Sequence, residues 1–332
     1  LNYTVTVDYV NELIKIYVNG AFITNMGMNG ARLTNSHPFR IGSKKDSQPG
    51  IDENFEGWID EVKLFDTLLT TEQIQQMIYQ EIENSSGNVH GVVLDQDISD
   101  SATNATIPWS NLIAYYPMSN IKSGKVSDES GNGYIATLHN MNSLLQQSAP
   151  MPFETSSDGD WTNEATWLHG DVWDIEDFEA FFTQAYQKTP EPYSIVKIHH
   201  NVTTSKSHEA LGMFIDSGKT LTVNGDNAIT NNRYLQLDGT LDLADDSQLI
   251  QTETSDLVTG ANGKILRRQE GNTMVHWYNY WSSPVGALGA TTLSDNNGSL
   301  NNVNNTPFRL NMLKQADGNN VQFTTALSPP LS

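Results

Sequence analysis

Near residue 66 the spacing of hydrophobic residues changes from the alternation of a β-strand to the spacing of a helix. In 55–65 apolar side chains occupy both faces of an alternating pattern, which is typical of an inner strand in a two-layer β structure. Thr70 then stands three residues before Gln73, the spacing of a capping box that opens a helix. The apolar residues that follow recur at helical spacing and form one stripe: Ile74, Met77, Ile78 and Ile82. A buried strand followed by a short helix predicts the end of a β-domain.

The residues before this helix alternate in the same way and predict an all-β segment. The expected strands are 3–9, 13–18, 21–24, 38–43 and 56–65. Asn19-Gly20 separates two of these apolar runs and predicts a tight hairpin, because both residue types tolerate positive φ.

Particular residues in this segment resemble a known family. GWIDEVKLFD at 57–66, followed by TTEQI at 70–74, is similar to the closing segment of laminin-G-like, concanavalin A-like jelly rolls. KIYVNG at 15–20 and FRIGS at 39–43 resemble the strands that precede it. The resemblance covers about 3–82 and implies the C-terminal half of such a β-sandwich, so we expect a first domain at 1–83. Because this fold carries lectins, adhesion modules and glycosidases, the resemblance implies a fold more strongly than a function.

The next segment combines turn-forming residues with a second, shorter resemblance. Residues 84–111 are rich in Ser, Gly, Asn, Asp and Pro and predict a linker. LIAYYPMSN at 112–120 and SDESGNGYIATLHNM at 127–141 resemble the opening strand and loop of a laminin-G-like domain, but too few residues follow for a complete one. Two alternatives remain: a truncated copy, or strands that pack onto the preceding half. We expect a linker and small β-subdomain at 84–157.

From residue 158 the chain repeats with a period near 20. This offset pairs Thr220 with Thr240, and Ile195 with Ile215 and Leu235. A fixed period of this length, with short strands and Gly/Asn/Asp turns, indicates stacked coils. We therefore expect a β-solenoid-like module at 158–332 that is incomplete at its C-terminus; a β-sandwich is the alternative. A short amphipathic helix is predicted from Asp174 to Lys188.

The repeating region also carries a resemblance to a different group of proteins. LTVNGDN, GTLDLADDSQLIQT, GKILRRQEG and HWYNYWSSPVG resemble a repeated module of Bacteroidetes surface proteins exported by the type IX secretion system. This resemblance covers about 158–289 and implies a cell-surface or secreted adhesin-like protein. It implies secretion and surface-anchoring machinery as partners, and no catalytic residues.

Composition narrows the classes of partner and site. The chain has 332 residues, and its net charge of −21 argues against nucleic acid or an anionic membrane as a partner. It has no cysteine, which excludes disulfides, Cys-ligated zinc and a thiol nucleophile. It also lacks an apolar run of about 18 residues, so we expect no membrane insertion.

Two sets of residues are candidates for binding. Asp128 and Asn132 lie in an oxygen-rich loop that suits Ca²⁺, a hard cation that prefers oxygen ligands; an ordinary Asn-Gly turn is the alternative. Trp161, Trp167 and Trp173 are spaced six residues apart, which puts their rings on one face of an extended chain. Such rings stack on sugars, although large aromatic residues more often fill a core.

Two further sequence patterns bear on hydrolysis and on glycosylation. Jelly-roll glycosidases carry E-x-D-x-x-E on one strand, whereas EGWIDE at 56–61 has Trp58 at the position of the central acid. We therefore expect a non-enzymatic protein. Thr67 and Ser101 match the short D-[ST]-[small/apolar] pattern of O-glycosylated Bacteroidetes proteins.

Together these features predict an extracellular or outer-surface protein that binds a polysaccharide or other surface ligand, or acts as a stalk. The alternative is the carbohydrate-binding region of an exported polysaccharide-degrading enzyme whose catalytic domain lies elsewhere. Calcium is the one cofactor that the sequence suggests.

Overall fold

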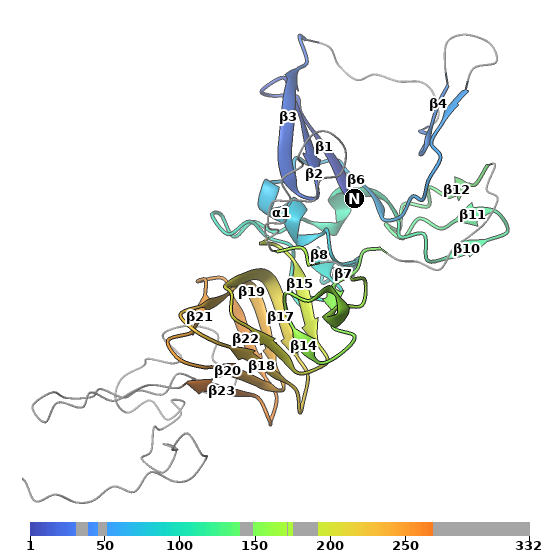
Figure 1. Ribbon diagram of the computed structural model, residues 1–332. Coiled ribbons are helices and arrows are strands. Elements are labelled where there is room, and N and C mark those ends of the chain that lie inside the picture. Colours follow the sequence, from blue (N-terminus) through green and yellow to red (C-terminus); the bar gives the residue numbers. More distant parts are fainter. Residues whose placement is uncertain (31–38, 46–51, 140–148, 171, 175–191, 268–332) are drawn as a thin grey trace, which may run out of the picture. The chain divides into compact units, whose positions relative to one another are not determined.

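A computed structural model describes residues 1–30, 39–45, 52–139, 149–170, 172–174 and 192–267 (Figure 1). The chain divides into two compact units, which we describe separately. The first unit is built around Leu1–Glu154, and the second begins at Thr155.

The first unit starts with an antiparallel sheet in the order β1-β2-β3. Its strands are β1 (Tyr3–Asp8), β2 (Leu13–Val18) and β3 (Ala21–Gly27). Asn19 and Gly20 both have positive φ and join β2 to β3, so the predicted hairpin is confirmed. Directly opposite residues share a face of the sheet, and one face is almost entirely apolar: Tyr3, Val5, Val7, Ile14, Ile16, Val18 and Met26. Tyr3, Val5 and Met26 on this face are exposed.

Helix α1 (Thr71–Gln76) begins where the capping box predicted. Gln73 N donates to Thr70 Oγ1 at 3.3 Å, and Thr70 N donates to Gln73 Oε1 at 3.0 Å. The helix is shorter than its apolar stripe indicated, because it ends at Gln76 and Ile82 starts the next strand. The stripe is nevertheless buried throughout: Ile74, Met77, Ile78 and Ile82.

Residues 84–111 are folded, so the prediction of a linker was wrong. β7 (Ile82–Ser85) and β8 (Asn88–Gly91) form a hairpin, and a 3₁₀ turn, η1 (Trp109–Asn111), precedes β9 (Leu112–Tyr116). Apolar residues of this stretch join those behind α1 in one core: Met77, Ile82, Val89, Ile98, Ile107, Leu112 and Tyr115. Val89, Ile98 and Ile107 stand singly between turn-forming residues, so hydrophobic periodicity does not reveal that they belong to the core.

The closing strand of the first half pairs with a later segment. β6 (Val62–Phe65) is shorter than the predicted 56–65 and lies antiparallel to β9, with Val62 opposite Tyr116. Of the two alternatives for 112–141, the structure therefore has strands that pack onto the preceding half. The remaining short strands of this unit are β4 (Ser43–Lys45), β5 (Asp52–Asn54), β10 (Ile121–Lys122), β11 (Lys125–Val126) and β12 (Ala136–Thr137). The predicted strand 38–43 is represented only by β4, and residue 38 lies outside the described residues.

The second unit is a β-solenoid of parallel strands, as the repeat predicted (Figure 1). One sheet has the order β14-β16-β18-β20-β23: β14 (Gly159–Asp160), β16 (Val202–Thr204), β18 (Thr220–Val223), β20 (Thr240–Leu243) and β23 (Lys264–Arg267). The other contains β15 (Ile195–Ile198), β17 (His208–Ile215), β19 (Ala228–Leu237), β21 (Gln248–Gln251) and β22 (Asp256–Thr259). The two-residue strand β13 (Phe153–Glu154) comes before them in the chain.

The register of the coils agrees with the period in the sequence. Thr220 lies opposite Thr240, and Leu221 lies opposite Leu241. The next pair of strands is offset by 24 residues, Thr240 with Lys264, so the period lengthens after β20. Inward-pointing aliphatic side chains are fully buried along the stack: Ile195, Val202, Ile215, Leu221, Leu235 and Leu241. The predicted helix after Asp174 lies outside the described residues. In the part of the chain that is described, no helix has the length and apolar character needed to cross a membrane.

Close stacking predicts that Gly239 does not tolerate a side chain. A Cβ at this position would lie 2.2 Å from Asp216 O and 2.5 Å from Lys219 O, which are backbone atoms of the preceding coil. We expect Gly239→Ala to lower the free energy of unfolding by about 1–3 kcal/mol, because the coils must move apart. Gly27→Ala is the matched control, since a Cβ there meets only Asn29 Oδ1, at 3.8 Å. Denaturant unfolding that gave the same loss for both variants would contradict the close stacking.

Candidate functional site

The three tryptophans at the start of the second unit come together, but not on an extended strand. Trp161 follows β14, whereas Trp167 ends the 3₁₀ turn η2 (Glu164–Thr166). Asn163 caps this turn and folds the chain back. The ring centroids lie 5.0 Å apart for Trp161 and Trp167, and 4.6 Å apart for Trp167 and Trp173.

Burial corrects the prediction that Trp161, Trp167 and Trp173 contact a ligand. Their exposed fractions are 0%, 4% and 2%. Trp167 Nε1 donates to Trp161 O at 2.7 Å, so the rings are also held by hydrogen bonding. An indole ring that is enclosed on all sides presents no face to a sugar, and the alternative reading of a core-filling cluster is correct.

His208, which no sequence motif indicated, completes this cluster. Its imidazole stacks on Trp161 with a centroid separation of 4.2 Å. Nδ1 lies 2.7 Å from Asp174 Oδ2, and Nε2 lies 2.6 Å from Thr204 Oγ1. Asp174 also accepts a hydrogen bond from Trp161 Nε1 at 3.1 Å. Asp174 and Thr204 are 34 and 4 residues away from His208 in the chain, so only the folded coil brings the three side chains together.

A hydroxyl, an imidazole and a carboxylate in this order form the geometry used to activate a nucleophile. Thr204 is fully buried, however, and the side chains of His208 and Asp174 are only 1% and 3% exposed. No substrate reaches a hydroxyl in that position. The network satisfies polar groups beneath the tryptophan cluster and acts structurally.

Asp128 and Asn132, the predicted calcium ligands, organise the loop after β11. Asp128 Oδ1 accepts from Tyr115 N at 2.9 Å and Ser130 N at 3.0 Å, and Oδ2 accepts from Tyr134 N at 3.0 Å. Burial opposes ionisation, but these donors outweigh it and lower the pKa of Asp128. Asn132 Nδ2 donates to Leu112 O at 2.9 Å. The loop is therefore held by its own amides, and calcium binding there stays a prediction.

A second carboxylate, Glu61, has a buried side chain in the first unit and lies in the middle of the predicted strand 56–65. Residue 61 instead has φ of +54° and precedes β6. Its Oε2 lies 2.5 Å from Lys63 Nζ, and Tyr115 OH donates to both carboxylate oxygens at 3.1 Å. Burial raises the pKa of Glu61, and the ammonium of Lys63 opposes that rise. With its charge and lone pairs committed to Lys63 and Tyr115, this carboxylate lacks the open position that a glycosidase acid requires.

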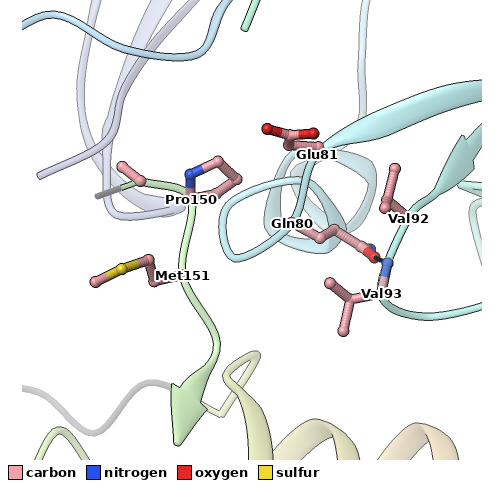
Figure 2. Close-up of a pocket in the computed structure, with 7 residues that line it drawn as sticks. Gln80, Glu81, Val92, Val93, Pro150 and Met151 are labelled. Atoms are coloured by element: carbon pink, nitrogen blue, oxygen red, sulfur yellow. Dashed lines mark hydrogen bonds between the residues drawn. The ribbon is translucent and has the colours of Figure 1, made fainter. Parts of the chain in front are cut away.

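An open pocket of about 280 Å³ lies in the first unit (Figure 2). It is lined by Gln80, Glu81, Val92, Val93, Ala149, Pro150 and Met151. Gln80 Oε1 accepts from Val93 N at 3.1 Å and Leu94 N at 2.9 Å, and its Nε2 donates to Gln76 O at 2.7 Å. The amide of Gln80 thus supports the loop and offers little to a ligand. Among the described residues, no group of three or more His, Asp or Glu side chains is arranged to hold a metal ion.

The two predicted glycosylation positions are both on the surface. Thr67 is exposed in the turn after β6. Ser101 is also exposed, and its Oγ donates to Glu72 Oε2 at 2.8 Å, beside the first turn of α1. Attachment of a glycan to Ser101 therefore requires the hydroxyl to leave Glu72.

In contrast to the buried tryptophans of the second unit, several aromatic residues of the first unit are exposed. Tyr3 is 68% exposed on the apolar face of the first sheet, and Trp58, in the loop before β6, is 67% exposed. The alternating pattern of 55–65 predicted that Trp58 belongs to an inner strand, which is wrong, because the strand begins only at Val62 and Trp58 is exposed. Its exposure makes it available for stacking on a ligand.

The first unit contains the part of the chain that comparison relates to known proteins. A family model described as the concanavalin A-like lectin/glucanases superfamily matches residues 2–75. A comparison with curated proteins found no match, and neither did a comparison with solved structures. The match confirms the resemblance of the first domain at the level of this superfamily. The resemblance of 158–289 to exported surface proteins stays a prediction.

Removing the imidazole beneath the tryptophans tests its structural role. We expect His208→Phe to lower the free energy of unfolding of the second unit by about 3 kcal/mol, because the buried Asp174 loses its shortest hydrogen bond and keeps only that from Trp161. His199→Phe is the matched control: His199 Nδ1 lies 2.6 Å from Asp216, but both side chains are substantially exposed. That control should lose about 1 kcal/mol or less. Calorimetry that ranked the two variants equally would contradict the buried network.

Asp128→Ala tests the loop after β11. We expect a loss of about 1–3 kcal/mol at pH 7, because three backbone amides lose their acceptor. Folding lowers the pKa of Asp128. The stability that this carboxylate contributes is therefore present above its unfolded pKa of about 3.9, and it is lost as pH falls through the lower pKa of the folded state. Glu129→Ala, an exposed carboxylate in the same loop, should change little. The difference between the two variants, measured by urea unfolding, should therefore narrow in acid.

Proposed function

We propose that this chain is part of a non-enzymatic, adhesin-like protein of the cell surface or extracellular space whose first unit binds carbohydrate. The observation that carries the proposal is the match of residues 2–75 to the concanavalin A-like lectin/glucanases superfamily. Laminin-G-like and concanavalin A-like domains are often extracellular. In this proposal an extracellular polysaccharide is the ligand.

The environment of the carboxylates in 56–61 favours a binding function over hydrolysis. The segment that corresponds to a glycosidase acid motif offers Trp58 to the surface and holds Glu61 in contact with Lys63 and Tyr115. A retaining or inverting glycosidase needs two carboxyl groups that face one substrate, with a gap between them of about 5–10 Å. The neighbouring carboxylate, Asp60, accepts a hydrogen bond from Glu61 N at 3.0 Å through its Oδ1.

The second unit suits a spacer in this proposal. Parallel coils with a continuous aliphatic core extend by repetition and need no disulfide, which fits a chain without cysteine. Export by the type IX secretion system and a Bacteroidetes origin belong to the same proposal, on the resemblance of 158–289. The second candidate function is the carbohydrate-binding region of an exported polysaccharide-degrading enzyme; the glucanases within the matched superfamily favour keeping it.

A glycan array probed with the whole chain tests this proposal. We expect binding to a defined polysaccharide, and Trp58→Ala should weaken it about tenfold or more, because truncating an anchoring aromatic side chain commonly costs over 1 kcal/mol. Leu168→Ala removes another exposed apolar side chain, in the second unit, and should bind like the parent. An array without signal would contradict the carbohydrate-binding role, and release of reducing ends from the bound polysaccharide would contradict the non-enzymatic one.

Calcium is tested in the same experiment. The arrays are repeated with added calcium and with a chelator, and the melting temperature is recorded in both. Calcium held at Asp128 and Asn132 should raise the melting temperature and strengthen binding. An unchanged melting temperature would contradict calcium at this loop and leave carbohydrate binding to be judged separately.

A further inference from the structure

His90 lies between two carboxylates in the hairpin region of the first unit. Its Nδ1 lies 2.8 Å from Asp97 Oδ1, and its Nε2 lies 3.0 Å from Asp95 Oδ1. An ionised carboxylate only accepts hydrogen bonds, so each ring nitrogen must carry a proton to make both contacts. The geometry therefore fits the imidazolium form of His90 and loses at least one hydrogen bond when the ring is neutral.

The clamp joins strand β8 to the loop that follows it. Asn88 Nδ2 donates to Asp97 Oδ2 at 2.7 Å, which fixes the second oxygen of that carboxylate. Two backbone bonds cross the same junction: Gly91 N to Gln96 O at 3.0 Å, and Ile98 N to Val89 O at 2.9 Å. The loop delivers Leu94 and Ile98 into the interior of the unit, where both are buried.

Every titratable group that faces His90 in the described chain is acidic. Asp95 and Asp97 contact the ring, and Glu83 lies opposite His90 in the β7–β8 register. Desolvation opposes protonation, but the two carboxylate hydrogen bonds outweigh it and raise the pKa of His90 above 6.5. A group whose pKa is raised by folding stabilises the fold below its unfolded pKa, and this stabilisation is lost as pH rises through the folded pKa.

We propose that His90, Asp95 and Asp97 form a pH-sensitive clamp that holds the loop after β8 closed when the ring is protonated and loosens it at alkaline pH. The device acts on the core around Ile98 and is independent of any carbohydrate site.

Nuclear magnetic resonance of the whole chain tests the clamp directly. Ring ¹⁵N shifts should show both nitrogens of His90 protonated on the acid side of a titration midpoint that lies above 6.5. Asp97→Asn should lower this midpoint clearly. Asp95→Asn should lower it less, since Asp95 is 86% exposed and screened by water; for the same reason this variant folds even if the others do not. His90→Gln identifies the resonances, and His139→Gln, at an exposed histidine of the same unit, is the matched control.

Hydrogen exchange supplies the structural readout. Protection of the Gly91 and Ile98 amides, corrected for intrinsic exchange, should fall about tenfold between pH 6 and pH 9 for each pKa unit by which the clamp is shifted. The fall should be absent in His90→Gln and retained in His139→Gln. A midpoint at or below 6.5, a singly protonated ring, or equal pH dependence in both variants would overturn the clamp.

Discussion

The first unit depends on covering the apolar residues that follow Thr70. Helix α1 is six residues long, too short to be stable alone, so its packing face must be buried by other parts of the chain. Val89, Ile98 and Ile107 pack in one core with Met77 and Ile82, the residues of the stripe that follow the helix, although they come from a stretch that is otherwise polar and turn-rich. The pairing of β6 with β9 follows from the same requirement, since it brings Leu112 and Tyr115 onto the core behind the helix. A segment that resembles a linker is thus what makes the closing helix possible.

Local rules in the sequence predicted those features whose partners are near in the chain. Thr70 and Gln73 locate the start of the helix, Asn19-Gly20 locates a turn, and the period near 20 pairs Thr220 with Thr240. The helix end was misplaced because Ile82 continues the 3.6-residue spacing although the chain has already turned into β7. Periodicity records which residues are buried and does not distinguish a helix from a bend that buries the same side chains.

The candidate sites were harder to predict, because their partners are distant. Trp161, Trp167 and Trp173 do cluster, but the even spacing suggested a strand face where the chain forms a capped 3₁₀ turn. His208 reaches Asp174 across 34 residues, and no local pattern in the sequence marks such a pair. Asp128 was singled out for its oxygen atoms, and its backbone donors become visible only in the folded loop. Residue type indicated polarity or bulk correctly, while direction and burial required the tertiary structure.

Several carboxylates of this chain are hydrogen-bonded within the protein and stabilise its fold, whereas exposed aromatic side chains are available to a ligand. Glu61, Asp128 and Asp174 are each satisfied by donors of the protein itself, and such carboxylates stabilise loops that carry no disulfide. The exposed side chains of the first unit include large aromatic ones, among them Tyr3 and Trp58. Aromatic faces recognise the apolar face of a sugar ring without proton transfer, so a surface of this composition suits binding. Freeing the Glu61 carboxylate from Lys63 would cost several kcal/mol, because it would leave a buried charge without its partner.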